Sequence, residues 1–474
     1  MSLQFITGNS GNGKTKYLFN RIVKEAKANP RDNYLVIVPE QFTMQTQRQL
    51  VDLSENKAIM NIDVLSFKRL AYRVFDELGI TNLTVLEETG KNLVLRKLAA
   101  QEADKLGVIG RNLNRIGYIS EVKSLLSELV QYNISPEELG RYIASGRLSD
   151  TLSDKLKDVL VLYEAFEKFM QDKYITAEEI LNVLSNVAEE SAILRNSVIA
   201  FDEFTGFTPI QNQLIKKLFV ISKKIYVTLT IDCREDIFKS RGMQELFDMP
   251  KRTVKSLTEM AAFYGIEVEE PIILDKNYRL AENEELSFME QQFFRKRRCS
   301  FKKVPKHIHI DCLRDPKQEL TKIARRINEL VRNENLRYRD IAIVTGDVNI
   351  YAGYVREIFD KYNIPYFIDA TQEILFHPFI EFIRSIPDIA AQNFSADAVF
   401  RFLRCGFSEL LDSEIDVLEN YVLACGVRGK SAWDKKWVRL PKHKAGYDIE
   451  LLNQSRELCR MVWKNPSAEA VVSN

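Results

Sequence analysis

The sequence predicts an α/β fold in which a parallel sheet is interrupted by a helical insertion. Three short apolar segments near the N-terminus each precede a segment whose apolar residues have helical spacing. A long stretch of purely helical pattern follows, and strand-like apolar segments then return. Strands that alternate with helices in this way favour parallel pairing through right-handed crossover connections.

The strands expected in the first part of the chain are short and almost wholly apolar. They cover residues 3–7, 33–38, 61–65, 197–201, 224–231 and 268–274. Between them, residues 86–195 carry helical periodicity with Ser or Asp at several N-cap positions, and no strand pattern interrupts it. We therefore expect one α/β domain, made of residues 1–85 and 196–290, with residues 86–195 inserted as a helical domain.

A second α/β domain is predicted after the basic segment Arg295–Lys306. Residues 306–393 form its expected first part, and residues 394–474 have only helical patterns. Its strands are expected at residues 307–312, 340–345 and 366–369. The basic segment has seven Lys or Arg residues and no acid. It fits a nucleic-acid groove and a solvated linker equally well.

The composition and the termini exclude several classes of protein. The 67 Lys and Arg residues nearly balance the 66 Asp and Glu residues, so net charge alone indicates neither a nucleic-acid nor a membrane partner. Six scattered cysteines, with no C-x-x-C pair, give no metal site built from neighbouring ligands. The sequence has no signal peptide and no apolar segment of membrane-spanning length, so we expect a cytoplasmic protein with no membrane partner.

A phosphate-binding loop is predicted between the first strand and the first helix. Residues 8–15 match G-x-x-x-x-G-K-[ST] in full, in the strand–loop–helix context that this motif requires. Lys14 is expected to reach the β- and γ-phosphates of ATP as a catalytic residue, and Thr15 to hold Mg²⁺. The alternative is a chance glycine turn. The residues expected to bind the nucleotide are Gly8, Asn9, Ser10, Gly11, Asn12, Gly13, Lys14 and Thr15.

An acidic pair after a buried strand is predicted to complete this site. Asp202 and Glu203 follow the apolar residues 198–201, so they emerge at the carboxyl edge of the sheet, where ligands of open α/β sheets bind. We expect Asp202 to bind hydrated Mg²⁺ and the catalytic Glu203 to orient or deprotonate the attacking water. Acidic pairs are also common in ordinary loops, so this assignment depends on the phosphate-binding loop.

Several segments resemble elements of superfamily 1 DNA helicases of the UvrD and PcrA kind. F-D-E-F-T at 201–205 resembles their D-E-x-Q element, and L-D-K-N-Y-R at 274–279 resembles L-x-x-N-Y-R. Segments 38–47 and 65–74 resemble two DNA-contacting elements, and 341–378 resembles the start of the second motor domain. The resemblance implies that Arg279 is catalytic, near the γ-phosphate. It also implies DNA contacts for Gln41, Phe42, Ser66 and Phe67.

Within that group, the sequence is most similar to the AddB-like subunits of bacterial AddAB helicase–nucleases. Only seven residues precede the loop, Thr205 replaces the glutamine of D-E-x-Q, and no G-D-x-x-Q follows strand 224–231. The resemblance implies a RecA-like P-loop domain and an incomplete second RecA-like domain. It further implies an ATP- and DNA-binding subunit that resects DNA ends in double-strand break repair by homologous recombination.

The same resemblance implies an AddA-like partner subunit and contacts with single- and double-stranded DNA. AddB-like subunits continue into a nuclease domain with a four-cysteine 4Fe-4S cluster; neither pattern occurs in this sequence. We therefore expect an N-terminal fragment, with the cluster only in the missing C-terminal part.

Two functional hypotheses stay open, and a third is less favoured. Glu203 favours ATP hydrolysis within a DNA motor, whereas Thr205 and the missing G-D-x-x-Q favour a module that binds nucleotide and DNA without motor activity. A P-loop kinase of small molecules, or another unrelated P-loop ATPase, is disfavoured by the helical insertion and by the N-Y-R element.

Overall fold

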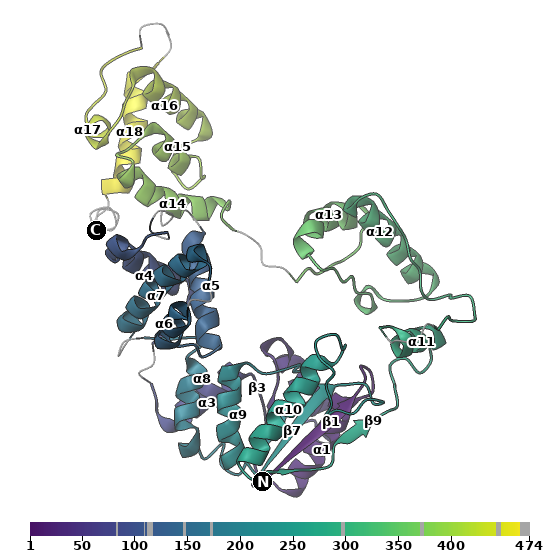
Figure 1. Ribbon diagram of the computed structural model, residues 1–474. Coiled ribbons are helices and arrows are strands. Elements are labelled where there is room, and N and C mark those ends of the chain that lie inside the picture. Colours follow the sequence, from purple (N-terminus) through teal and green to yellow (C-terminus); the bar gives the residue numbers. More distant parts are fainter. Residues whose placement is uncertain are drawn as a thin grey trace. The chain divides into compact units, whose positions relative to one another are not determined.

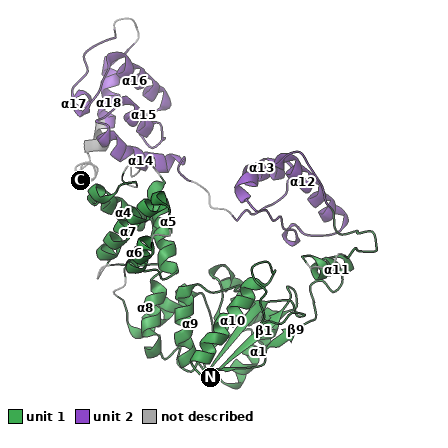
Figure 2. Cartoon of the chain, in the orientation of Figure 1, with its two compact units in different colours: residues 1–309 green, residues 310–474 purple. Residues whose placement is uncertain are grey.

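The chain divides into two compact units, residues 1–309 and residues 310–474 (Figure 2). The computed structural model describes residues 1–81, 84–108, 110, 117–145, 148–170, 174–294, 299–369, 374–441 and 447–464. Arg295–Arg298, the first part of the basic segment, lies outside these ranges. Within them, no helix has the combination of length and apolar character needed to cross a membrane.

A seven-stranded sheet with parallel strand pairs forms the centre of the first unit (Figure 1). The strand order is β3-β2-β6-β7-β1-β8, and β9 also pairs with β1. The bounds are β1 (Ser2–Gly8), β2 (Tyr34–Ile37), β3 (Ile62–Leu65), β6 (Val198–Phe201), β7 (Lys224–Thr230), β8 (Glu267–Val268) and β9 (Ile272–Leu274). The α/β fold with a parallel sheet is therefore confirmed.

Helices cover both faces of this sheet. On one face lie α1 (Lys14–Ala28) and α2 (Thr43–Leu53). On the other lie α3 (Phe67–Leu78), α8 (Ile180–Val187), α9 (Pro209–Ile221) and α10 (Asp248–Phe263). Successive side chains of β1 alternate between the two cores, so Phe5 packs in one and Ile6 in the other. Burial on both faces explains why the strands are almost wholly apolar.

The helices of the insertion pack around a core of their own. They are α4 (Glu88–Gln101), α5 (Tyr118–Gln131), α6 (Pro136–Ala144) and α7 (Asp150–Met170). The expectation that no strand interrupts residues 86–195 is wrong, because β4 (Val85–Leu86) pairs with β5 (Ile175–Thr176). Strands of two residues are too short for a period of two to be visible in the sequence. Helix α8, although within residues 86–195, packs against the main sheet.

A short helix, α11 (Glu284–Gln292), follows the sheet. Among the described residues of the second unit, all regular elements are helices. Helices α12 (Pro316–Asn333) and α13 (Val348–Lys361) pack on each other. A separate core joins α14 (Pro378–Ala391), α15 (Ala396–Leu403), α16 (Asp412–Cys425), α17 (Lys430–Asp434) and α18 (Ile449–Lys464). Its largest buried side chains include Trp433, whose ring centroid lies 5.4 Å from that of Trp437.

The strands predicted in residues 306–393 are not formed. Residues 307–312, 340–345 and 366–369 are all described, and none of them pairs with a strand. Apolar side chains in these segments are left in solvent, with Ile310 94% and Val344 92% exposed. A strand requires a hydrogen-bonded neighbour, whereas the apolar pattern reports only on the segment itself. The prediction of these strands was wrong because no neighbour is available among the residues described.

A buried ion pair connects helix α4 of the insertion with the segment just before α8. Lys91 Nζ on α4 lies 2.6 Å from Glu178 Oε2, and the two side chains are 3% and 11% exposed. We predict that Lys91→Met lowers the free energy of unfolding by about 3 kcal/mol, because it leaves a buried carboxylate without its partner. Denaturant unfolding measures this loss, and adding Glu178→Gln should recover part of it.

The matched control is Lys105→Met, which removes an exposed ion pair with Glu102. Exposed pairs contribute little, so this variant should unfold close to the wild-type midpoint. Equal losses for Lys91→Met and Lys105→Met would contradict a special role for the buried pair.

Candidate nucleotide site

The loop between β1 and α1 has the backbone shape that its glycines predict. Gly11 and Gly13 adopt φ angles of 89° and 79°, which L-residues with a side chain rarely adopt. Gly13 is the N-cap of α1, and no side chain in the described part of the chain caps this helix end. The first backbone N–H groups of α1 therefore remain available to an anion, at the positive end of the helix dipole.

The side chain of Lys14 folds back over the preceding residues of the loop. Its Nζ donates to the carbonyl oxygens of Gly8 and Asn9, at 3.1 and 3.0 Å. Burial lowers the pKa of this ammonium, and the carboxylates of Glu203 and Asp202 oppose that shift. An ammonium group held within the loop by two carbonyl oxygens is well placed to exchange them for phosphate oxygens, which carry a full negative charge.

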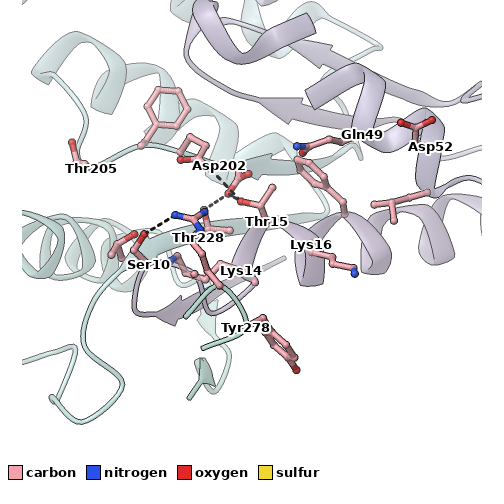
Figure 3. A pocket seen from close by; sticks show the side chains of 18 residues that line it. Ser10, Lys14, Thr15, Lys16, Gln49, Asp52, Asp202, Thr205, Thr228 and Tyr278 are labelled. Atoms are coloured by element: carbon pink, nitrogen blue, oxygen red, sulfur yellow. Dashed lines mark hydrogen bonds between the residues drawn. The ribbon is translucent and has the colours of Figure 1, made fainter. Parts of the chain in front are cut away.

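Asp202 and Glu203 meet Thr15 at the carboxyl edge of the sheet. The Thr15 hydroxyl lies 3.3 Å from Asp202 Oδ1 and 3.3 Å from Glu203 Oε1. Thr228 on β7 also donates its hydroxyl to Asp202 Oδ1 (Figure 3). Glu203 is exposed and has a φ of 64°, an unusual backbone conformation for a residue with a side chain. The structure thus brings together residues that are far apart in the sequence.

The second oxygen of Asp202 is available for a cation. Asp202 is 1% exposed, and its Oδ2 is buried without a hydrogen-bond partner among the described residues. Burial raises the pKa of this carboxyl group, the Thr228 hydroxyl opposes the shift, and nearby Glu203 adds to it. An unpartnered buried oxygen is costly, and coordination of a cation would remove that cost.

These donors fit Mg²⁺ carried by a nucleotide. Mg²⁺ prefers oxygen ligands and is usually bound by one or two carboxylates together with phosphates and water. Asp202 Oδ2 and the Thr15 hydroxyl supply such oxygens at one point of the sheet edge. Within the described ranges there is no group of three or more His, Cys, Asp or Glu side chains that could hold a metal. The protein's share of the coordination is therefore small, and phosphate oxygens would complete it.

A cavity of about 710 Å³ lies over the loop. This volume is within the usual range for small-molecule sites. Lys14, Thr15, Asp202 and Thr228 gather on one side of it, whereas Thr205 lies apart from them (Figure 3). Besides these residues, its lining includes Ser10, Lys16, Gln49, Asp52, Glu203, Tyr278 and Arg279.

Arg279 also reaches the loop, although it lies far away along the chain. Its Nη1 is 3.4 Å from the Ser10 hydroxyl, and the preceding Tyr278 donates its backbone N–H to the Gly11 carbonyl at 3.0 Å. The positive charge of Arg279 contributes to lowering the pKa of Lys14. The guanidinium therefore shares a pocket with the loop and the acidic pair.

The residues predicted to contact DNA have two different environments. Gln41 is exposed and Phe42 is half-buried, both in the short helix Glu40–Phe42. Ser66 is buried and caps α3 by accepting the Arg69 N–H. Phe67 is only 7% exposed. Its ring packs against Phe201 and Phe204, with centroids 5.8 and 5.5 Å away.

The burial of Phe67 disfavours the DNA contact implied for this residue. Helix α3 covers the sheet, and Phe67, as its first residue, faces the core. The residue also lines a small cavity together with Glu40 and Ser66. The DNA contacts of Gln41, Phe42, Ser66 and Phe67 all stay predictions.

Sequence reasoning missed the role of Thr228. This residue is 3% exposed and holds Asp202 from the neighbouring strand. A signal was present, because Thr228 and Thr230 alternate at the carboxyl end of an otherwise apolar strand. Asp232, two residues beyond the strand, forms an ion pair with Arg234 at 2.7 Å.

Comparison with known proteins places this site within a family. A family model described as "ADDB, N-terminal" matches residues 5–290, a range that contains the loop, the acidic pair and Arg279. The chain belongs to the AddB family. The site described above therefore lies wholly within the AddB N-terminal region.

Curated relatives extend the similarity over the whole chain. The B subunit of the ATP-dependent helicase/deoxyribonuclease of Lachnoclostridium phytofermentans is 38% identical over 480 aligned residues, covering 100% of this chain and 42% of the relative. The corresponding protein of Clostridioides difficile is 33% identical, with coverages of 100% and 41%. That of Caldanaerobacter subterraneus is 34% identical, with coverages of 96% and 39%. This chain thus spans about two fifths of the length of these AddB relatives.

The burial of Phe67 predicts a loss of stability when its ring is removed. We expect Phe67→Ala to lower the free energy of unfolding by about 3–5 kcal/mol, the usual cost of deleting a buried aromatic ring. Thermal and denaturant unfolding measure this change, and any loss of DNA binding should follow the fraction unfolded. The exposed Gln41→Ala should leave stability within about 0.5 kcal/mol of wild type. A stable Phe67→Ala protein with weakened DNA binding would contradict the core assignment.

Proposed function

We propose that this chain binds ATP with Mg²⁺ at residues 8–15, as part of an AddB protein in a helicase–nuclease that resects DNA ends in double-strand break repair by homologous recombination. The buried, unpartnered oxygen of Asp202 carries the proposal, because it lies beside Thr15 of a complete phosphate-binding loop. The relatives are named as components of an ATP-dependent helicase/deoxyribonuclease, which supports the wider role.

A RecA-like fold, an AddA-like partner subunit and DNA as a ligand are also part of the proposed function. A parallel sheet with β1 between β7 and β8, and the loop directly after β1, supports a RecA-like domain. Since the relatives are named as one subunit of an enzyme, a partner is expected, which we propose to be an AddA-like helicase–nuclease subunit. Single- and double-stranded DNA are the proposed ligands at the carboxyl edge of the sheet, with Gln41 the most accessible of the predicted contacts.

Each residue of the site has a separate proposed task. Lys14 and the N–H groups of the loop neutralise the β- and γ-phosphates. Thr15 and Asp202 hold Mg²⁺, which when bound neutralises phosphate charge. Glu203 orients or deprotonates the attacking water. Arg279 stabilises charge on the terminal phosphate.

A second candidate function is a binding module without motor activity. Thr205 is exposed and lies apart from Lys14 and Asp202, and its side chain is too short to replace the glutamine of D-E-x-Q (Figure 3). Asp232, at the end of β7, is occupied by Arg234. These features favour nucleotide and DNA binding over hydrolysis coupled to DNA.

We predict that Lys14→Ala abolishes nucleotide binding and leaves the fold intact. The variant removes the ammonium that would neutralise phosphate charge, while its present hydrogen-bond acceptors are two loop carbonyls. Titration of the full-length protein with a fluorescent ATP analogue measures binding, and thermal unfolding reports on the fold. Lys24→Ala, on the exposed face of the same helix, is the control and should bind normally. Undiminished affinity in Lys14→Ala would overturn the assignment of this loop.

Glu203→Gln separates a motor from a module. Glutamate and glutamine are nearly isosteric, and the proposed metal ligand Asp202 is unchanged, so the affinity for ATP should persist. In a motor, loss of the base would lower turnover by about 10² or more. We expect little DNA-stimulated hydrolysis from this site even before the substitution, and hence little further loss.

The measurement uses the assembled complex in which the P-loop lysine of the AddA-like partner is replaced, so that the remaining hydrolysis belongs to this chain. DNA-stimulated turnover that collapses in Glu203→Gln would instead make this protein a second motor.

A further inference from the structure

The segment between β9 and α11 lies against the outer side of the phosphate-binding loop. Leu274 accepts a hydrogen bond from Asn12 Nδ2 at 2.5 Å through its carbonyl oxygen. Asn277 Nδ2 donates to the Ser10 carbonyl at 2.8 Å, and Tyr278 donates its N–H to the Gly11 carbonyl at 3.0 Å. Residues 274–279, named here the strap, thus contact the loop at three successive points.

The fit between the strap and the loop is close. A Cβ atom added to Gly11 would lie 2.7 Å from Asn277 Oδ1 and 2.8 Å from Arg279 Cβ. Distances this short do not occur between a real Cβ and its neighbours, so this glycine is needed for contact as well as for its φ angle. Asn277 and Arg279 therefore have little freedom to move while the loop keeps its shape.

Asn277 connects two parts of the site through one side-chain amide. Its Nδ2 is bonded to the loop at Ser10, while its Oδ1 accepts the backbone N–H groups of Arg279 and Leu280 at 3.1 and 3.0 Å. The Arg279 side chain is exposed, and its Nη1 donates to the Ser10 hydroxyl at the long distance of 3.4 Å. The direction of the guanidinium thus depends more on its own backbone than on its side-chain contacts.

We infer that Asn277 is a positioning residue that gives this site its preference for a nucleoside triphosphate over a diphosphate. The inference rests on the proposed function and deepens it. Among the charged groups of the pocket, Arg279 comes from the strap, whereas Lys14 and Asp202 are held by other contacts. A change at Asn277 therefore displaces Arg279, which is proposed to act only on the terminal phosphate, and leaves Lys14 and the proposed metal ligand Asp202 in place.

The expected effect of Asn277→Ala is selective. The affinity for a non-hydrolysable ATP analogue should fall about tenfold, the scale of one charge-assisted hydrogen bond, while the affinity for ADP should change much less. A residue with a purely structural role would weaken both nucleotides in the same proportion. The ratio of the two dissociation constants distinguishes these cases.

The experiment measures both dissociation constants by calorimetry on the full-length protein with Mg²⁺. The single variants are Asn277→Ala and Arg279→Ala, and the double variant carries both. Since Asn277 acts through Arg279, the double variant should lose no more of the preference than Arg279→Ala alone. Asn283→Ala is the matched control, because Asn283 caps α11 by accepting the Leu286 N–H.

A second variant guards against misfolding. Asn277→Ser can still accept a backbone N–H within the turn but is too short to reach Ser10, so it should lose part of the preference. Wild-type protein that binds neither nucleotide would refute the proposed function itself. Wild-type binding with an unchanged ratio in both Asn277 variants, or additive losses in the double variant, would overturn only the role of Asn277.

Discussion

Parallel pairing of β1 on both sides is the constraint on which the site depends. Residues 2–8 pair with β7 along their whole length, and β8 and β9 pair with the other edge of the strand. In a parallel sheet all carboxyl ends reach one edge, so the loop after β1 meets Asp202 after β6 and Leu274 at the end of β9. Segments that are far apart along the chain are thus brought together by backbone hydrogen bonds.

The same edge of the sheet contains buried charged groups whose desolvation is unfavourable, and binding of a ligand would offset this free energy. Asp202 is buried with one oxygen that no described residue partners, and burial also lowers the pKa of Lys14 nearby. Thr15 and Thr228 both donate their hydroxyl groups to the other oxygen of Asp202 and fix its direction. Buried charged groups without full compensation are typical of sites prepared for an ionic ligand rather than of optimised cores.

The sequence predicted those parts of the structure whose signal is local. The loop at residues 8–15, the strand before Asp202 and the amphipathic helices each depend on a short pattern, and each is present. The environment of Phe67 could not be predicted from a local pattern, because an aromatic residue after a strand can either stack on a DNA base or pack in the core, where Phe67 lies. The strands expected at 307–312 and 340–345 failed for a related reason: pairing depends on a neighbour that the segment itself does not encode.

Nucleotide binding and DNA-coupled hydrolysis need different groups at this edge of the sheet. The groups needed for binding are present, whereas those needed for coupling are not evident among the described residues. Binding needs the loop backbone, one ammonium and oxygen ligands for a cation, and these converge with their directions fixed by neighbouring strands. Hydrolysis coupled to DNA also needs a group that links the terminal phosphate to the polymer. Thr205 is too short for that task, and Asp232 is already paired with Arg234. The strap and α11 each contact the loop, through Asn277 at the Ser10 carbonyl and through Glu290 at the Asn9 side chain. The segment after β7 contacts the loop as well, because Cys233 donates its backbone N–H to Asn9 Oδ1 at 3.0 Å.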